Sequence, residues 1–275
     1  MQFRTVIEPL SGQTPIDHSQ HIVMLGSCFT DNVGARLARD GFTVSVNAMG
    51  TLYNPASIAR CVTRALERRP YTADDLVLRD GIWHCLDYES RRQGTDPEHL
   101  LAQLNGDFTV FCQTLARADV MIVTFGTAWV FEHVATGRIA GNCHKLRADE
   151  FVRRRMTATE IAGLWEPIAA GRRIIFTVSP IRHLADGLHG NALSKATLLT
   201  AIDAMGAEYF PSFEIMNDDL RDYRFYAADM KHPSEVAVDY IYDLFGQTYF
   251  SARTQAEALQ HRREYARSQH RPIIG

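Results

Sequence analysis

The sequence predicts an α/β protein in which helices cover both faces of a mostly parallel sheet. Several short apolar runs end in small or turn residues, which is typical of buried strands. Segments with the 3.6-residue periodicity of amphipathic helices follow most of these runs. Strands that alternate with helices form right-handed βαβ units, and such units build a parallel sheet between two helical layers.

The expected elements alternate along most of the chain. Four strands have a strong pattern, and a fifth, at 208–215, has a weaker one; the strong strands are His21–Gly26, 42–48, Val120–Phe125 and 173–178. The expected helices span 27–39, 55–68, 97–117, 191–205 and 234–249. The first of them carries Phe29, Val33 and Leu37 on one face, because residues four apart lie on the same side of a helix.

Two stretches interrupt the alternation and are interpreted as β-hairpins at the edge of the sheet. Residues 76–86 contain Asp80-Gly81 between β-prone residues, which is a strong hairpin signal. Residues 128–142 contain Thr136-Gly137 between two short apolar runs. The Arg-rich run at 153–155 is interpreted as solvated helix or loop surface.

No linker or repeat divides the chain, so residues 1–250 are interpreted as a single domain. The polar segment 251–275 is expected to be a helical C-terminal tail. It could pack on this domain, or on a second copy to form a homo-oligomer.

The composition argues against several classes of protein. Of the 275 residues, 46% are hydrophobic and 22% charged, and 29 basic against 32 acidic residues give a net charge of −3. This lacks the basic excess typical of nucleic-acid binding. No apolar run is long enough to cross a membrane, and the N-terminus lacks the apolar core of a signal peptide. The five cysteines form no C-x-x-C pair, which favours reduced thiols and a cytoplasmic protein.

Ser27 lies where the first strand ends and the first helix begins. Ligands bind at this end of open α/β sheets, and a helix N-terminus offers unpaired N–H groups to a developing oxyanion. By position alone, however, a helix-capping role for Ser27 is favoured. Cys28 is a rival nucleophile, but its side chain is expected to be buried or to point sideways.

A serine hydroxyl needs a base to become a good nucleophile. The chain has eleven histidines, and context selects His232, in the segment Asp229-Met230-Lys231-His232-Pro233. This loop follows the fifth strand, so it lies at the same end of the sheet as Ser27. Asp229, three residues earlier, can reach one ring nitrogen and leave the other facing Ser27. The D-x-x-H spacing alone is a weak signal, since it often occurs by chance.

Together these segments resemble the GSCFA family, within the SGNH (GDSL-like) hydrolase superfamily. The resemblance covers about residues 20–250 and lies in the segments Leu25-Gly26-Ser27-Cys28-Phe29-Thr30, Gly50-Thr51-Leu52-Tyr53-Asn54-Pro55, Thr124-Phe125-Gly126-Thr127-Ala128, Asn142-Cys143-His144-Lys145, Ser179-Pro180-Ile181-Arg182-His183 and Tyr223 to Pro233. Thr30 stands where the family usually has alanine. The resemblance implies a flavodoxin-like three-layer α/β/α sandwich with a five-stranded sheet.

The same resemblance implies roles for individual residues. Ser27 matches the nucleophile, Asp229 the acid and His232 the base. The backbone N–H groups of Ser27 and Gly50 match two donors of the oxyanion hole. The third donor of the superfamily is an asparagine, but Ala128 stands at its position here, so Thr127 or Asn142 is a candidate substitute.

Other polar residues are candidates for substrate binding. Arg182 and His183 follow the fourth strand, and the Arg182 guanidinium could pair with a carboxylate or phosphate. Asn142 and His144 follow the second hairpin and fit a solvated turn equally well. Tyr53 follows the candidate oxyanion glycine.

The sequence has no H-x-x-x-H or H-E-x-x-H spacing, so no metal site is expected. It has no G-x-G-x-x-G or Walker motif either, so no nucleotide cofactor is expected.

The resemblance implies a serine esterase that removes a short acyl group, such as acetyl, from a carbohydrate or small ester. Two alternatives remain open. The same triad could serve an O-acyltransferase, with a sugar hydroxyl in place of water. The missing asparagine also fits a non-catalytic glycan-binding module. The expected partner is the ester substrate, with no nucleic acid and no membrane.

Overall fold

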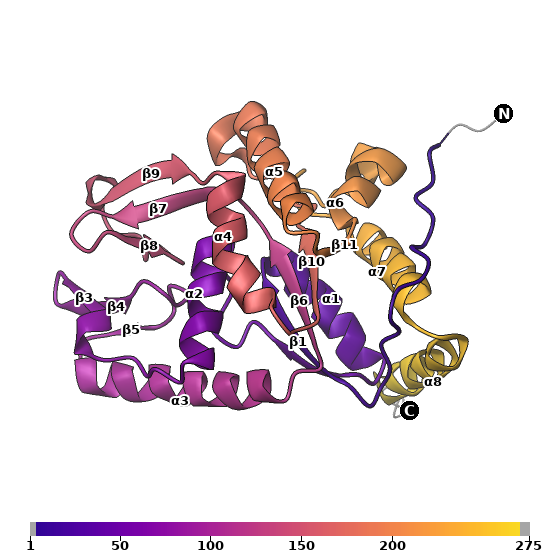
Figure 1. The fold of residues 1–275 in the computed structure, drawn as a ribbon, viewed down its shortest axis with the longest axis horizontal. Helices are drawn as coiled ribbons and strands as arrows, with labels where there is room; N and C mark the ends of the chain where they lie inside the picture. Colours follow the sequence, from indigo (N-terminus) through magenta and orange to yellow (C-terminus); the bar gives the residue numbers. More distant parts are fainter. Residues whose placement is uncertain (1–3, 270–275) are drawn as a thin grey trace, which may run out of the picture.

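The computed structural model describes residues 4–269 and is built around a parallel sheet of five strands (Figure 1). In sheet order these strands are β11 (Glu208–Phe210), β10 (Ile174–Val178), β6 (Val120–Phe125), β1 (His21–Gly26) and β2 (Thr43–Val46). The predicted α/β/α sandwich with a five-stranded sheet is confirmed. Strands β1 and β6 are neighbours, and the chain runs from β1 to β2 on one side of them and from β6 to β10 on the other.

Both faces of the sheet are buried, because successive side chains of each strand enter different cores. Val23 and Leu25 of β1 belong to one apolar core, while Ile22 and Met24 belong to the other. The first core is covered by α2 (Pro55–Leu66), α3 (Pro97–Ala116), α4 (Ala158–Ala169) and α5 (Gly187–Ala204). The second core is covered by α1 (Cys28–Arg39) and α7 (Glu235–Tyr249). This two-sided burial explains the continuous apolar runs of the strands.

Helix α4 (Ala158–Ala169) and the region after Glu208 differ from the sequence prediction. Helix α4 was not predicted, although Thr157 and Glu160 form a capping box at its start. The predicted strand 208–215 ends at Phe210, and the chain continues through a helical turn, α6 (Ser212–Glu214), and a π-helix, η4 (Ile215–Leu220). The Ser212 hydroxyl donates to Val178 O at 2.8 Å and thereby ties this helical turn to the end of β10.

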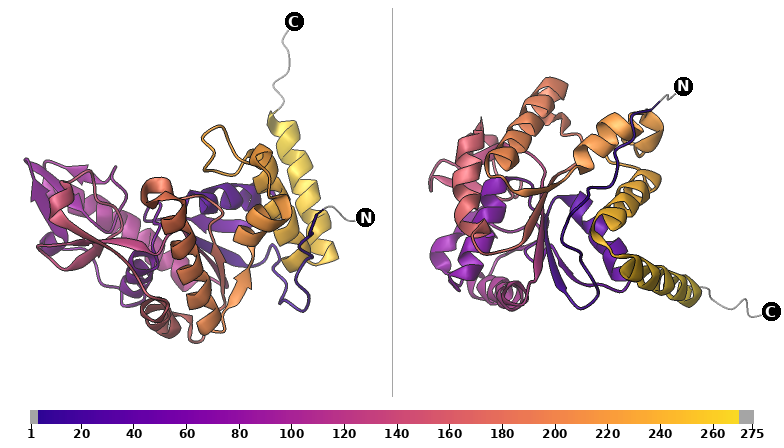
Figure 2. Two further views of the ribbon diagram at one scale, coloured as in Figure 1. Left: turned by 90° about the horizontal axis from the view of Figure 1, so that it is seen from above. Right: turned by 45° about the vertical axis from the view of Figure 1, so that its right-hand side comes forward.

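The two predicted hairpins are present, but each belongs to a separate antiparallel sheet of three strands. One contains β3 (Leu76–Arg79), β4 (Ile82–Cys85) and β5 (Gln93–Gly94). The other contains β7 (Trp129–His133), β8 (Arg138–Ala140) and β9 (Phe151–Arg155). The Arg-rich run is therefore part of strand β9 rather than helix or loop, and it pairs with β7. Both small sheets lie at one end of the molecule (Figure 2).

The C-terminal segment forms a helix, α8 (Ala252–Gln269), at the opposite end of the molecule (Figures 1 and 2). It packs on its own domain through the buried carboxylate of Asp40, which accepts a hydrogen bond from Arg262 at 2.6 Å and another from Arg39 at 2.8 Å. Arg262 Nε donates a second bond at 3.2 Å, and the Tyr242 hydroxyl of α7 donates a further one at 3.0 Å. Residues 270–275 of the predicted tail lie outside the described part. Within residues 4–269, no helix is long and apolar enough to span a membrane.

Candidate active site

The topology of the sheet places Ser27 at its switch point, just beyond the carboxyl end of β1. Gly26 precedes it with a φ of +143°, and a Cβ atom there would lie 2.2 Å from Thr124 O. Only glycine fits this turn, so it fixes where Ser27 emerges from the sheet.

Ser27 occupies the N-cap position of α1, but its side chain makes no capping hydrogen bond. Its hydroxyl donates to the Ser179 hydroxyl instead, with 3.1 Å between the two oxygens. Ser27 therefore has the backbone position of a helix cap, but its side chain does not cap the helix. The hydroxyl is directed away from its own helix, into a pocket.

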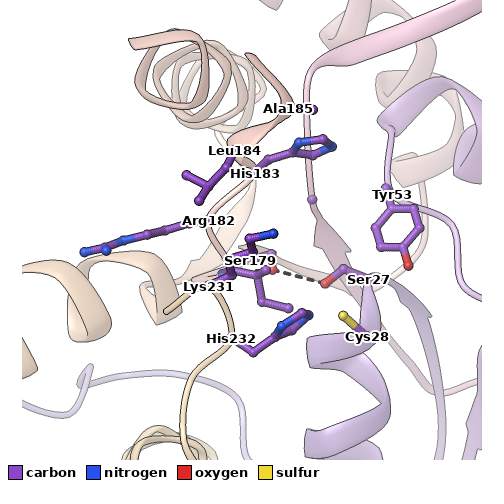
Figure 3. Close-up of a pocket in the computed structure, with 12 residues that line it drawn as sticks. Ser27, Cys28, Tyr53, Ser179, Arg182, His183, Leu184, Ala185, Lys231 and His232 are labelled. Atoms are coloured by element: carbon purple, nitrogen blue, oxygen red, sulfur yellow. Dashed lines mark hydrogen bonds between the residues drawn. The ribbon is translucent and has the colours of Figure 1, made fainter. Parts of the chain in front are cut away.

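This pocket, called here the Ser27 pocket, has a volume of about 300 Å³. It brings together residues from the ends of β1, β6 and β10 and from the loop before α7 (Figure 3). Its lining comprises Ser27, Cys28, Tyr53, Gly126, Ser179, Ile181, Arg182, His183, Leu184, Ala185, Lys231 and His232. Five of the sequence-predicted site residues thus share one cavity: Ser27, Tyr53, Arg182, His183 and His232.

Asp229 and His232 form a tight turn beside the pocket. Asp229 Oδ2 lies 2.5 Å from His232 Nδ1, while Oδ1 accepts the backbone N–H groups of Lys231 and His232, both at 3.0 Å. Met230, between them, has a left-handed φ of +58°. The N–H groups of His232 and Lys231 and the His232 ring hold the pKa of Asp229 well below its ordinary value. The carboxylate is therefore ionised and orients the ring so that Nε2 remains free.

Ser27 and His232 line the same pocket without a mutual hydrogen bond in the described structure. Figure 3 shows the His232 ring on the side of the pocket where Ser27 and Cys28 lie. The Ser27 proton points to Ser179 instead. The serine must turn from Ser179 toward the imidazole before a proton could pass between them.

Cys28 lines the same pocket, contrary to the expectation that its side chain would be buried or lateral. Burial raises the pKa of its thiol, and the nearby Asp31 carboxylate raises it further. The thiol is thus protonated near neutral pH, and a protonated thiol is a poor nucleophile.

Gly50 does not line the Ser27 pocket. Its N–H donates to Asn47 O at 2.7 Å, and the residue borders a separate polar cavity with Asp31 and Glu89. The predicted oxyanion role would require this hydrogen bond to break. The left-handed φ of Gly50, +81°, belongs to the turn that the bond closes.

The two candidate substitutes for the third oxyanion donor also lie elsewhere. The Thr127 hydroxyl is buried and shares a hydrogen bond with Ser194 at 3.1 Å, while its N–H donates to Tyr53 O at 3.0 Å. Asn142 Oδ1 accepts the N–H of His144 at 2.8 Å. Neither residue lines the pocket.

His144 is buried under the first small sheet and does not line the pocket, so its predicted substrate contact is wrong in this structure. Its Nε2 lies 2.8 Å from Cys85 O and 3.1 Å from Tyr88 O. Burial lowers the pKa of the imidazole, which favours the neutral form that donates to these carbonyls. His144 thus anchors the loop after β8 to the loop after β4.

Arg182 and His183 form one wall of the pocket, as predicted for residues after β10. The Arg182 guanidinium stacks over the rings of Tyr226, at 4.0 Å, and Tyr223, at 4.9 Å. Its side chain extends away from Ser27 (Figure 3). Burial lowers the pKa of the His183 ring.

Sequence reasoning missed two buried residues of this region, Ser179 and Lys195. Lys195 Nζ donates to Gly126 O and to Ser179 O, both at 2.7 Å, and so ties the end of β6 to the end of β10. The spacing of Lys195, Leu198 and Ile202, which lie on one buried face of α5, is the feature of the sequence that indicates a buried lysine. Burial lowers the pKa of Lys195 to about 7.

No group of three or more potential metal ligands occurs within residues 4–269. The side chains that line the Ser27 pocket offer two serine hydroxyls, a tyrosine phenol, a thiol, two imidazoles and two cationic groups.

A search of the curated proteins finds no match. Among solved structures, the chain is similar to an acetyl xylan esterase, Est2A, from the rumen bacterium Butyrivibrio proteoclasticus, with a TM-score of 0.39 and 11% identity. The alignment covers 86% of this chain but 66% of the esterase, so the chain spans slightly less than two thirds of that protein. The sequence model of the GSCFA family matches residues 21–245, which include both the Ser27 turn and the Asp229–His232 turn. Matched over most of its length, the chain belongs to the GSCFA family.

Proposed function

We propose that this protein is a serine esterase in which Ser27 is the nucleophile, His232 the general base and Asp229 the residue that orients the base. The observation that carries the proposal is the convergence of three features at one cavity. A serine hydroxyl that does not cap its helix lies in the pocket, and a histidine already bonded to a carboxylate lines the same pocket. This set of groups supports nucleophilic catalysis at an acyl carbon.

In the proposed reaction, Ser27 turns toward His232, and Oγ attacks the acyl carbon while Nε2 takes its proton. The imidazolium is stabilised by Asp229 at Nδ1 and then protonates the departing alcohol as the ester C–O bond breaks. Water, deprotonated by His232, attacks the acyl-serine and releases the carboxylic acid. The proton returns to Ser27 Oγ, so the enzyme is regenerated.

The N-terminus of α1 supplies donors for the oxyanion. The backbone N–H groups of Ser27 and Cys28 lie ahead of the Thr30 N–H, which donates to Ser27 O at 2.8 Å in the first turn of the helix. They open the helix, where the partial positive charge of the dipole adds to their effect. These two groups replace Gly50 in the proposed site, since the Gly50 N–H is bonded to Asn47 O.

The proposed substrate has a short acyl group, such as acetyl, on a carbohydrate or other small alcohol. The pocket is small, and Ile181, Leu184 and Ala185 contribute apolar surface to it. Tyr53 offers a partly exposed ring against which a sugar could stack.

The first test measures hydrolysis of p-nitrophenyl acetate by the wild type and by Ser27→Ala. We expect the variant to lose turnover by at least about 10³-fold with its fold intact, because the nucleophile is gone. Ser11→Ala is the matched control, since Ser11 is an exposed serine with no side-chain hydrogen bond in the described structure. Unchanged turnover in a clean Ser27→Ala preparation would reject the nucleophile.

The missing bond between Ser27 and His232 is the observation that favours a second candidate, a glycan-binding module. A protein that binds acetylated or free oligosaccharides but hydrolyses no ester would match this alternative.

Product analysis with and without acceptor sugars separates an esterase from an O-acyltransferase that uses the same residues.

A further inference from the structure

Ser179 is a pocket residue to which the reaction above assigns no role. It is the first residue after β10, its side chain is buried, and it lines the Ser27 pocket. Its Oγ lies 3.1 Å from Ser27 Oγ (Figure 3). No other side-chain hydroxyl in the described structure is hydrogen-bonded to Ser27.

The hydrogen bonds of Ser179 leave its own proton unused. A serine hydroxyl has two acceptor lone pairs and one donor. Ser179 Oγ accepts the Ser27 hydroxyl at 3.1 Å and the backbone N–H of Ile181 at 3.3 Å. Both lone pairs are then occupied, and the Ser179 proton has no acceptor in the described part of the chain. A buried donor without an acceptor is costly, so an oxygen atom of a ligand in the pocket would be its natural partner.

The backbone of Ser179 is held firmly in place. Its N–H donates to Phe125 O at 2.8 Å, and its carbonyl accepts a hydrogen bond from Lys195 Nζ at 2.7 Å. The same ammonium group donates to Gly126 O, at the end of the neighbouring strand β6, at 2.7 Å. A donor fixed in this way needs little rearrangement when charge develops near it, which is what makes an oxyanion donor effective.

We propose that the Ser179 hydroxyl donates a hydrogen bond to the substrate carbonyl oxygen as it becomes an oxyanion, beside the N–H groups of Ser27 and Cys28. The proposal rests on the proposed esterase function. When Ser27 attacks, the carbonyl carbon becomes bonded to Ser27 Oγ, so the oxyanion forms next to an atom that Ser179 already contacts. Ser179 is thus the third oxyanion donor in this proposal. Thr127 and Asn142 cannot fill that role, because both are hydrogen-bonded elsewhere and neither lines the pocket.

The test compares Ser179→Ala with the wild type on p-nitrophenyl acetate and on its thiono analogue, in which sulfur replaces the carbonyl oxygen. Sulfur is a weak acceptor, so the thionoester gains little from an oxyanion donor. We expect Ser179→Ala to lower kcat for the oxygen ester by about 10²-fold, with KM nearly unchanged, and to affect the thionoester much less. Ser179→Thr, which keeps a hydroxyl, should retain most of the activity.

Ser212→Ala is the control, because Ser212 is a buried serine near the end of β11 that does not line the pocket. Equal losses on both esters would show that Ser179 only positions Ser27, and no loss would show that it is not needed; either result overturns the proposal. Should Ser179→Ala fail to fold, Ser179→Cys provides the comparison, with nearly the same shape and a weak donor. Failure of the esterase function itself is recognised separately, as unchanged turnover by Ser27→Ala.

Discussion

Ser27 and His232 reach one pocket from distant parts of the chain, and each is placed by a turn of unusual backbone geometry. Gly26 allows the turn that delivers Ser27 from β1, because any side chain there would collide with Thr124 O. Met230, in a left-handed conformation, closes the turn that joins Asp229 to His232. At the scale of single residues, the proposed chemistry therefore depends on two local turns that hold the reacting groups.

The most informative substitution in the second turn is Asp229→Asn. The amide can still accept the backbone N–H groups, but it would donate to His232 Nδ1 and place the ring proton on Nε2. The ring then cannot accept the Ser27 proton, and we expect kcat for p-nitrophenyl acetate to fall by roughly 10³–10⁴-fold. Asp222→Asn is the matched control, since Asp222 also caps an exposed turn, at Arg224 N. Activity within a few-fold of wild type in Asp229→Asn would contradict the role of this carboxylate.

The sequence predicted some of the residues that line the pocket, but it also placed Gly50, Thr127, Asn142 and His144 at the site, and none of these lines the pocket. Ser27, Tyr53, Arg182, His183 and His232 share the pocket as their positions after strands indicated. His144 and Asn142 do not, because the loop after β8 turns the His144 ring toward Cys85 O and Tyr88 O, and Asn142 Oδ1 accepts the His144 N–H. Such a turn depends on contacts with β4, which are distant in sequence.

At the scale of elements, the local pattern of apolar residues predicted the strands and helices whose buried residues form a clear run or stripe. The limits of β1 and β6 were predicted to the residue, because both are buried over nearly their whole length and consist mostly of apolar residues. Strand β9 carries three arginines, so its sequence resembles exposed loop; it is a strand because it pairs with β7 over five residues. Helix α4 was missed although Ile161, Trp165 and Ile168 follow helical spacing, since the strand before it was not recognised.

Helix α5 is distinguished by Lys195, whose buried ammonium bonds to two carbonyls at strand ends. Burial lowers its pKa from 10.5 to about 7. Between these values the unfolded chain binds more protons than the folded protein, so this group makes stability rise with pH across that interval. Below about pH 7 the lysine is protonated in both states, and its contribution no longer changes with pH.

We therefore expect Lys195→Met to flatten the dependence of unfolding free energy on pH between about 7 and 10, where the lysine contributes at most about 1.4 kcal/mol per pH unit. Urea unfolding at several pH values measures this slope. The comparison with wild type removes the effects of other groups that titrate in the same range. Lys145→Met, at an exposed position, should behave as wild type. A Lys195→Met slope equal to that of wild type would contradict the assignment.

At the scale of the whole molecule, the site lies at the carboxyl ends of the strands of one sheet, whose two faces are covered by separate apolar cores. The order of the strands, with β2 and β6 on either side of β1, creates the crevice above Ser27. The family resemblance implied a five-stranded sheet between two helical layers, but the order of its strands was not predicted, because it does not follow from any single segment. Oligomerisation through the tail stays a prediction, which sedimentation analysis can measure.

The docking of α8 depends on the buried carboxylate of Asp40. Burial alone would raise its pKa, but the hydrogen bonds from Arg262 and Arg39 hold the pKa below its ordinary value. Arg262→Gln removes one charged partner while Arg39 and Tyr242 remain. We expect a loss of about 1–2 kcal/mol in unfolding free energy, measured by urea unfolding. Arg253→Gln removes an exposed pair with Glu257 on the same helix and should cost under about 0.5 kcal/mol. Equal effects of the two substitutions would contradict the anchoring role.

The central claim, that Ser27 is an activated nucleophile, is tested most directly by covalent labelling with a fluorophosphonate. Intact mass and peptide mapping would report how many probe molecules bind and to which side chain. We predict one adduct per chain on Ser27, absent from Ser27→Ala and strongly slowed in Asp229→Asn. No adduct on the folded wild type, or an adduct on Cys28 that persists in Ser27→Ala, would contradict the account.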